Sequence, residues 1–259
     1  MDLGIRGRKA IVCASSQGLG RGCASALAAE GVSVVINGRH PELLEQTAAE
    51  IRQSSGVEVI TVVADLMAPG GVDAVLAACP APDILVTNNA GPPFRDFREL
   101  DREALLTGIT MNMLIPIELI QRTIGGMAER GFGRIVNITS SSVKMPMAGL
   151  DLSSGARAGL TAFVAGVART VAEKNVTINN LLPGYFDTAR LRSGFTRSAS
   201  RSGTTEAAVA TREALTIPAR RFGTPAEFGA ACAFLCSVPA AYLTGQNILL
   251  DGGLFPGTF

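Results

Sequence analysis

The sequence predicts an α/β domain with a doubly wound parallel sheet of about seven strands and helices on both faces. Short apolar runs rich in Val and Ile alternate with longer segments of helical period, and 47% of the residues are hydrophobic. The apolar runs end in Gly, Pro, Asn or Asp, which is typical of strands that helices cover on both sides. Repeated strand-helix alternation predicts right-handed βαβ units in one parallel sheet.

The predicted elements follow this alternation along the whole chain. Apolar runs predict strands at 10–14, 33–37, 57–64, 84–87, 134–139, 177–182 and 247–250. Helical periodicity predicts helices at 19–30, 41–53, 102–129, 160–174 and 225–236. Since neither a linker nor an internal repeat interrupts the pattern, we expect residues 1–259 to form a single domain.

The segment 187–221 breaks this rhythm. It is rich in Arg, Ser, Gly and Thr and has only a weak helical pattern near 206–214. Because it follows the carboxyl end of a predicted strand, where open α/β sheets bind ligands, we interpret it as a substrate lid rather than a surface insertion. Its arginines would suit a substrate with an acidic or acyl-carrier portion: Arg190, Arg192, Arg197 and Arg201.

Composition excludes several classes of function. The net charge is +1 and the sequence has no basic block, so we expect neither a nucleic acid nor an anionic membrane as a partner. The apolar runs are shorter than the roughly 18 residues of a membrane span. The five cysteines are scattered and there is one histidine, so we expect free thiols and no metal site. We see no export signal and expect a cytoplasmic protein.

The first predicted strand leads into a glycine turn and then a helix. Ser15, Ser16, Gln17, Gly18, Leu19 and Gly20 form this turn. Glycines let a backbone approach a diphosphate closely, and a helix N-terminus offers free N–H groups and a positive dipole end. The turn therefore predicts a nucleotide site, although such a turn by itself is weak evidence.

Further motifs follow this turn in order: Asp65-Leu66 after the third predicted strand, Asn89-Ala90-Gly91 after the fourth, and Pro183-Gly184 with Thr188 after the sixth. Together they give the chain a resemblance to the classical short-chain dehydrogenase/reductase family, of the 3-oxoacyl-ACP reductase type. The resemblance extends from about residue 3 to residue 253 and implies a Rossmann fold. It implies that Asp65 and Leu66 contact the adenine, that Asn89, Ala90 and Gly91 form the family's Asn-Asn-Ala-Gly segment, and that Pro183, Gly184 and Thr188 position the nicotinamide.

The end of the second predicted strand bears on the choice of cofactor. An acidic residue at this point binds the ribose hydroxyls of NAD and repels a 2′-phosphate. The chain instead has Arg39, whose guanidinium is well suited to phosphate. We therefore expect NADP rather than NAD, with a solvated loop arginine as the alternative reading.

The resemblance also implies a catalytic set, of which two members match. Ser140 follows the fifth predicted strand at the position of the catalytic serine, and Asn112 lies in the long helix that carries the family's asparagine. Ser153 stands where the family's tyrosine acid is expected, and Arg157 stands where its lysine is expected. A serine hydroxyl is a far weaker acid than a phenol, and arginine does not simply replace an ammonium group. The sequence therefore predicts an altered proton path.

Three residues are candidates for replacing the missing acid. Tyr185 follows the Pro-Gly turn and is a possible donor or a packing residue over the nicotinamide. Lys144 lies in the loop after Ser140, with a solvated lysine as the alternative reading, and Asp151 is expected to be an N-terminal cap or dipole partner of the following helix.

Three functions remain open. The first is an NADP-dependent oxidoreductase that acts on a carbonyl or alcohol group of a small-molecule or acyl substrate. The others are a non-redox enzyme on the same fold and an inert dinucleotide-binding sensor or scaffold. The long helices 102–129 and 153–174 match the family's subunit contacts, so we expect a homotetramer, with a dimer as the alternative.

Overall fold

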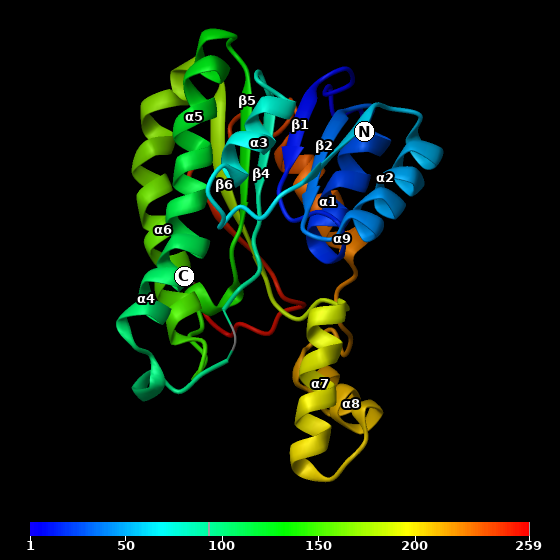
Figure 1. Ribbon diagram of the computed structural model, residues 1–259, viewed down its shortest axis with the longest axis vertical. Helices are drawn as coiled ribbons and strands as arrows, with labels where there is room; N and C mark the ends of the chain where they lie inside the picture. The colour runs from blue at the N-terminus through cyan, green and yellow to red at the C-terminus, as the bar shows by residue number, and fades with distance from the viewer. Residues whose placement is uncertain (93, 259) are drawn as a thin grey trace.

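The computed structural model describes residues 1–92 and 94–258 and contains one seven-stranded parallel sheet (Figure 1). The strands follow the order β3-β2-β1-β4-β5-β6-β7, in which β1 and β4 are neighbours at the centre. Their bounds are Lys9–Val12, Ser33–Gly38, Val59–Val63, Ile84–Thr87, Gly133–Ile138, Val176–Pro183 and Asn247–Leu250 for β1 to β7. The predicted fold class, a doubly wound parallel sheet, is confirmed.

Helices cover both faces of the sheet. One layer contains α1 (Gly18–Ala29), α2 (Pro41–Ser55) and α9 (Pro225–Leu235). The other contains α3 (Gly71–Ala78), α5 (Ile115–Glu129) and α6 (Asp151–Val171), and α4 (Arg102–Ile109) precedes α5. Successive strand residues point to opposite layers, as Val12 and Ile11 do in β1. This two-sided burial explains the continuous apolar character of the strands.

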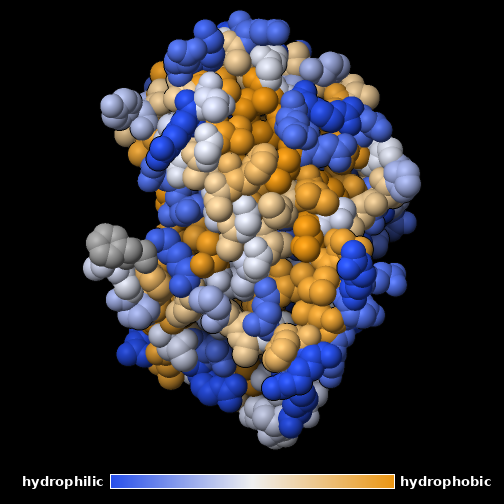
Figure 2. Space-filling model, turned by 90° about the vertical axis from the view of Figure 1, so that its left-hand side faces the viewer, coloured by the Kyte–Doolittle hydropathy of each residue, from blue (hydrophilic) through white to orange (hydrophobic). Residues whose placement is uncertain are grey.

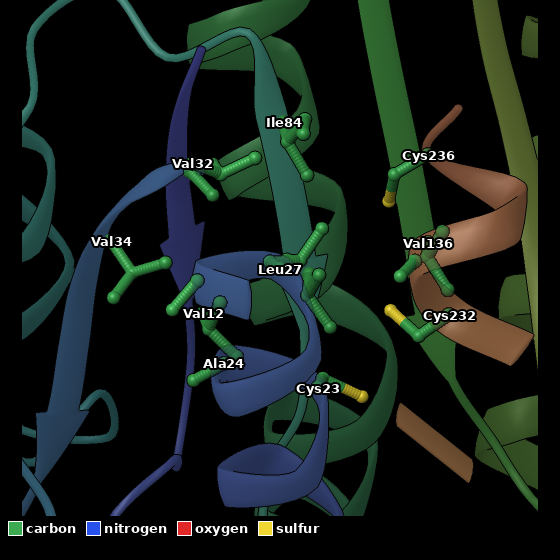
Figure 3. Close-up of a cluster of buried hydrophobic side chains, with 14 of the residues drawn as sticks. Val12, Cys23, Ala24, Leu27, Val32, Val34, Ile84, Val136, Cys232 and Cys236 are labelled. Atoms are coloured by element: carbon green, nitrogen blue, oxygen red, sulfur yellow. The ribbon is translucent and has the colours of Figure 1, made fainter. Parts of the chain in front are cut away.

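The contact between α1 and α9 is unusually close. A Cβ on Gly22 would lie 2.1 Å from the carbonyl oxygen of Pro225, and one on Gly229 would lie 2.1 Å from the carbonyl oxygen of Gly22. Beside this contact, the sulfur atoms of Cys23, Cys232 and Cys236 gather in the core (Figure 3). All five cysteines are buried free thiols. The cysteines of α1 and α9 therefore act as small apolar core residues.

Four helical features differ from the sequence prediction. The short helix α3 was not expected, and α6 begins at Asp151, nine residues before the periodic segment 160–174 but only two before the long helix expected at 153–174. The predicted helix 102–129 contains a π-helical turn at Thr110–Leu114. The segment 187–221 is not irregular but forms two helices, α7 (Ala189–Ser202) and α8 (Glu206–Thr216).

The helices α7 and α8 form an arm that extends away from the sheet (Figure 1). Thr188 caps the start of α7, and Gly203, with a φ of 63°, ends it. The arm has its own small core of Phe195, Ala199 and Val209. These caps and apolar contacts form the helices despite the polar composition of the segment.

By length and composition, the helical segment Arg102–Glu129 could cross a membrane, with a mean hydropathy of 1.4 over its most apolar part. In the fold, its buried side chains Ile115, Ile117, Leu119 and Ile120 belong to the core beside the sheet. The buried part of this apolar segment therefore serves core packing.

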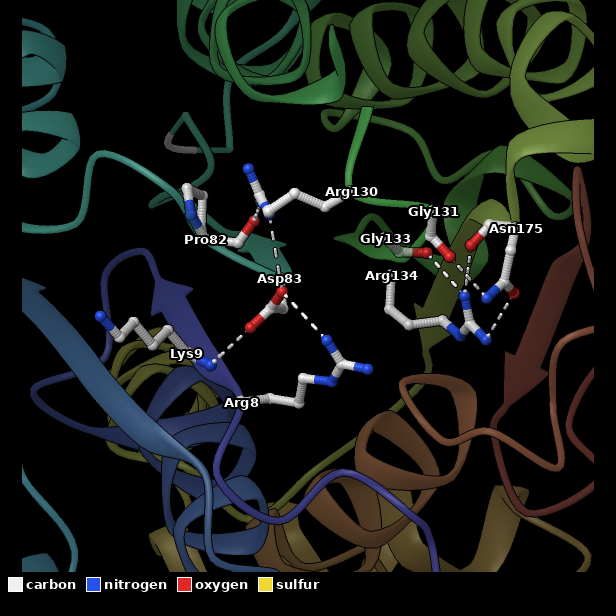
Figure 4. A network of polar contacts seen from close by, with 9 residues as sticks. All are labelled: Arg8, Lys9, Pro82, Asp83, Arg130, Gly131, Gly133, Arg134 and Asn175. Carbon is white, nitrogen blue, oxygen red and sulfur yellow. Dashed lines mark hydrogen bonds and ion pairs between the residues drawn. The ribbon is translucent and has the colours of Figure 1, made fainter. Parts of the chain in front are cut away.

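Charged groups tie together the amino ends of the central strands (Figure 4). Asp83, just before β4, accepts hydrogen bonds from the backbone N–H of Lys9 at 3.1 Å and from Nη1 of Arg8 at 3.4 Å. Nε of Arg130 lies 3.9 Å from the same carboxylate. The buried guanidinium of Arg134 donates to Ser237 and Asn175 across the neighbouring strands. This network lies at the sheet edge opposite the carboxyl ends of the strands.

Candidate cofactor and active site

In the turn after β1, the backbone of Gly20 packs too closely against the chain to leave room for a Cβ atom. Ala14 has a φ of 45° and Gly18 a φ of 60°, both in the left-handed region. A Cβ on Gly20 would lie 2.4 Å from the carbonyl oxygen of Ala14. Glycine at position 20 is therefore required for the turn to pass directly into α1.

The N-terminus of α1 is open to an anion. Its N-cap, Gln17, makes no side-chain capping bond in the described structure, and the first turn has no acidic residue. The first N–H groups of the helix therefore keep both their hydrogen-bonding capacity and their positive dipole end. Leu19 packs against the core and anchors this end of the helix.

Ser15 fixes the turn to the second strand. Its hydroxyl donates to the carbonyl oxygen of Val12 at 2.6 Å and accepts from the backbone N–H of Asn37 at 3.0 Å. Its own N–H donates to the carbonyl oxygen of Asn37 at 2.8 Å. The carbonyl oxygen of Ser16 accepts from the hydroxyl of Thr47 at 2.8 Å. Sequence reasoning assigned Ser15 a backbone role and missed these side-chain bonds.

The ends of β2 and β3 bring two predicted cofactor residues together. Nη1 of Arg39 lies 3.8 Å from Oδ2 of Asp65, and both side chains are partly exposed. Asp65 also accepts from the N–H of Met67 at 2.9 Å, while Leu66 is buried beneath the loop. This arrangement places an exposed cation and a hydrogen-bonded carboxylate at the ends of the two strands.

The segment after β4 lies against the same turn. Nδ2 of Asn88 donates to the carbonyl oxygen of Ala14 at 3.1 Å. Asn89 accepts from the N–H of Ala90 at 2.9 Å and donates to the carbonyl oxygen of Met111 at 3.3 Å. Gly91 faces the arm: a Cβ there would lie 2.8 Å from Nη2 of Arg190.

The segment after β6 also lies close to the glycine turn. Gly184 donates to the carbonyl oxygen of Leu250 at 2.8 Å, and a Cβ at this position would lie 2.7 Å from that of Asp251. Pro183 ends β6. Thr188 accepts from the N–H of Leu191 at 3.3 Å and lies beside Gly18, where a Cβ would be 3.6 Å from its methyl group. The start of the arm therefore contacts the glycine turn.

The hydrogen bonds that the Ser140 hydroxyl accepts leave its own O–H group to act as a donor. Its oxygen accepts from the backbone N–H of Ser142 at 3.1 Å and from the hydroxyl of Ser142 at 2.9 Å. With two donors on its oxygen, the proton of Ser140 is directed elsewhere. Sequence reasoning missed Ser142, because a run of three serines does not show which of them supports another.

Ser153 and Arg157 contact each other on α6. Nε of Arg157 donates to the hydroxyl of Ser153 at 3.3 Å, and Nη1 donates to the carbonyl oxygen of Ile138 at 2.7 Å. Burial, and then the charge of Arg190, lower the pKa of Arg157 from 12.5 to about 10. Ser153 also lines a narrow cleft with Pro92, Arg95, Leu100, Gly149, Leu150 and Leu152.

Asn112 lies in the π-helical turn and is buried. Its Nδ2 donates to the carbonyl oxygen of Gly108 at 3.3 Å. Its Oδ1 has no hydrogen-bond partner within the described part of the chain. An unpaired buried acceptor is costly, and π-helical turns are frequent at functional sites, so Oδ1 is a candidate for binding a water or a ligand.

The three candidate replacement acids lie in different surroundings. Tyr185 packs edge-on against Phe222 and lines a cavity of about 280 Å³ together with Glu227 and the segment after β7. Burial, and then Glu213, raise the pKa of its phenol. Lys144 lies 5.7 Å from the ring centre of Phe255, and Asp151 accepts from the N–H of Gly149 at 3.1 Å.

The comparisons with known proteins identify the family. Residues 13–255 match the family described as enoyl-(acyl carrier protein) reductase. The chain belongs to the short-chain dehydrogenase/reductase family of oxidoreductases. It is 30% identical to the NADPH-dependent reductase BacG of Bacillus subtilis (strain 168), over 95% of this chain and 97% of BacG. It is 30% identical to the 3-oxoacyl-[acyl-carrier-protein] reductase FabG of Aquifex aeolicus (strain VF5), over 98% and 100%.

Solved structures of short-chain reductases share the whole fold. The L-sorbose reductase of Gluconobacter frateurii, crystallised with NADPH and L-sorbose, superposes with a TM-score of 0.94 at 27% identity, and the match covers 99% of this chain and 100% of the reductase. The cofactor expected from Arg39 is the one named for this structure and for BacG.

Proposed function

We propose that this short-chain dehydrogenase/reductase is an NADP-dependent oxidoreductase that acts on a carbonyl or alcohol substrate through an altered proton path. The observation that carries the proposal is that the oxygen of Ser140 accepts two hydrogen bonds from Ser142, which leaves its own O–H to donate to another group. Arg157 binds the carbonyl oxygen of Ile138, two residues before Ser140. A hydrogen-bond donor beside a fixed positive charge suits the negative charge that develops on a reduced carbonyl oxygen.

The described residues fit an NADP molecule. The open N-terminus of α1 and the close approach at Gly20 suit a diphosphate. Arg39 is free to bind a 2′-phosphate, and Asp65 to bind the adenine amine. Ala90, Gly91, Pro183, Gly184 and Thr188 would line the nicotinamide side. When bound, the cofactor supplies a hydride.

In this proposal the side chains of the active site bind the reacting oxygen and move a proton. Ser140 donates to the carbonyl oxygen, and Arg157 stabilises the developing charge. Ser153 keeps the guanidinium in place through the bond to Nε. Oδ1 of Asn112 binds a water molecule that connects the site to solvent. Proton delivery then depends on serine hydroxyls and water, with Tyr185 as the alternative donor.

Two other functions share the same geometry. A non-redox enzyme would use Ser140 and Arg157 on a bound substrate without cofactor turnover. An inert sensor is consistent with the bonds of Arg157 to Ile138 and Ser153. Because these bonds engage Nε and Nη1 with protein acceptors, the guanidinium group has fewer N–H groups left for a substrate.

Cofactor turnover separates the three functions. We expect NADPH oxidation with members of a broad panel of carbonyl compounds, and a loss of at least about 100-fold in kcat/KM for Ser140→Ala, in line with removal of one oxyanion donor. The control, Ser54→Ala, removes a hydroxyl at the exposed end of α2. Product formation without NADPH oxidation supports the non-redox enzyme. No turnover by the parent, but activity in Ser153→Tyr with Arg157→Lys, supports the sensor.

The same proposal includes a homotetramer, with a dimer as the alternative, in the cytoplasm. An apolar band runs over the face formed by α4 to α6 (Figure 2). Leu105, Leu106, Leu114 and Phe163 are large apolar side chains exposed on these helices. An exposed band of this kind is typical of a subunit contact. The arm α7–α8 is proposed as the substrate lid of a single domain.

A further inference from the structure

Two arginine side chains, one on α6 and one on α7, lie near the candidate active site. Arg157 lies on α6 and is 8% exposed. Arg190 lies in the first turn of α7, and its Nη1 and Nη2 donate to the carbonyl oxygens of Gly91 and Pro92 at 3.3 and 3.4 Å. Pro92, which Arg190 binds, and Ser153, which Arg157 binds through Nε, line the same narrow cleft. The charge of Arg190 also contributes to the lowered pKa of Arg157.

Among the residues that the structure describes, neither arginine has an acidic partner. None of the ion pairs within residues 1–92 and 94–258 includes Arg157 or Arg190. Asp151, at the exposed start of α6, accepts from the N–H of Gly149 instead. Arg157 is buried, and buried cations are normally paired, whereas Arg190 is exposed at the start of α7. Two cations near each other repel, so an anion between them would be stabilised by both.

The arm shows a direct contrast to Arg190. Arg192, two residues further along α7, binds the carboxylate of Asp187 through two bonds of 2.7 and 2.8 Å. The acceptors of Arg190 are neutral carbonyl oxygens at the long end of the hydrogen-bond range. The protein therefore neutralises Arg192 and leaves Arg190 available at the site.

The bonds of Arg157 determine where such an anion would lie. Its Nε and Nη1 are engaged with Ser153 and Ile138, and its Nη2 has no hydrogen bond to any residue that the structure describes. Ile138 precedes Ser140 by two residues. An anion on Nη2 would therefore lie beside the carboxyl end of β5, which leads into the loop of Ser140. A guanidinium group matches the planar geometry of a carboxylate.

We propose that Arg157 and Arg190 bind a carboxylate of the substrate, so that the substrate is a small 2-oxo or 3-oxo acid, or the corresponding hydroxy acid, rather than a neutral carbonyl compound. This inference rests on the proposed reductase function and specifies its substrate class. The cofactor's own phosphates are the competing source of an anion for Arg190.

The test compares each acid with its uncharged ester. Pyruvate, acetoacetate and their methyl esters are titrated into the protein–NADP⁺ complex by calorimetry, and the NADPH affinity of each variant is measured separately. We expect at least one acid to bind about tenfold or more tightly than its ester, as a charge-assisted bond provides. In Arg190→Leu and in Arg157→Met, we expect the ratio of the affinity for the acid to that for its ester to fall to about one. The matched control Arg192→Leu keeps the preference for the acid, and if Arg157→Met does not fold, Arg190→Leu decides.

Two outcomes overturn this inference while leaving the proposed function intact. One is equal affinity of the parent complex for acid and ester in both pairs. The other is weaker NADPH binding by Arg190→Leu with the acid preference unchanged, which would assign Arg190 to the cofactor phosphates. A parent protein that does not bind NADP⁺ overturns the proposed function, and this inference with it.

Discussion

Nη1 of Arg39 lies 3.8 Å from Oδ2 of Asp65, so that the residues following β2 and β3 place opposite charges side by side next to the glycine turn. At this distance and exposure the pair holds the arginine loosely. Arg39 can therefore exchange the carboxylate for a phosphate without breaking a strong bond.

The first prediction concerns this arginine. Replacing Arg39 with Leu removes a charge-assisted phosphate contact worth about 1.5–3 kcal/mol, so the KM for NADPH should rise by about 10- to 150-fold while that for NADH changes little. Steady-state kinetics with both cofactors measures the effect. Arg21→Leu, which removes an exposed arginine of α1 paired with Glu50, is the control. Equal effects on the two cofactors would show that Arg39 does not recognise the 2′-phosphate.

The second prediction concerns the close contact at Gly20. Gly20→Ala places a Cβ 2.4 Å from the carbonyl oxygen of Ala14, so the turn must open. We expect a loss of about 1–3 kcal/mol in stability and weaker NADPH binding. Gly125→Ala in α5, where a Cβ meets no atom within 4 Å, should be neutral or stabilising. Thermal unfolding and fluorescence titration with NADPH test both variants; unchanged cofactor affinity in Gly20→Ala would contradict the assigned site.

The third prediction is a loss of activity at high pH. Burial lowers the pKa of Arg157 to about 10, so the guanidinium is charged below that pH and loses its proton as the pH rises through it. Since the charged form stabilises the developing oxyanion, kcat/KM should fall with an apparent pKa of about 10. In Arg157→Lys, an amine with an ordinary pKa of about 10.4 enters the same buried position, and the fall should move to lower pH. Identical pH profiles for the two proteins would exclude this role.

The fourth prediction concerns stability far from the site. Asp83 is mostly buried and connects Arg8, Lys9 and Arg130 at the amino ends of β1, β4 and β5. Asp83→Asn should lower the free energy of unfolding by about 1–2 kcal/mol without changing the KM for NADPH. Asp96→Asn, which breaks the exposed pair with Arg98, should change it by less than about 0.5 kcal/mol. Urea unfolding of both variants provides the comparison, and equal effects would mean that burial does not strengthen the Asp83 network.

The strands and the phosphate turn were predictable because they depend on local signals. The apolar runs are terminated by Gly, Pro, Asn or Asp, and the glycines stand between a strand and a helix. The helices α3 and α7 were not expected. Helix α3 has only eight residues, which are too few to show a clear helical periodicity. Helix α7 is stabilised by its Thr188 cap and by the packing of Phe195 against α8.

The active site was predictable only in part. Motif order indicated Ser140, Asn112, Ser153 and Arg157, and the structure places Ser153 and Arg157 in contact. Sequence alone could not show the support of Ser140 by Ser142, the π-helical turn at Asn112 or the reach of Arg190 to Gly91. Each of these depends on tertiary geometry rather than on spacing.

The contact of Gly22 with Pro225 and Gly229 has a consequence for how sequence changes reach the glycine turn. At both glycines a Cβ would meet a backbone oxygen at 2.1 Å, so a side chain at either position forces α1 and α9 apart. Because α1 begins at Gly18, four residues before Gly22, such a displacement would shift the helix end that follows the turn. A substitution at Gly229, on α9, would therefore disturb the turn without contacting it.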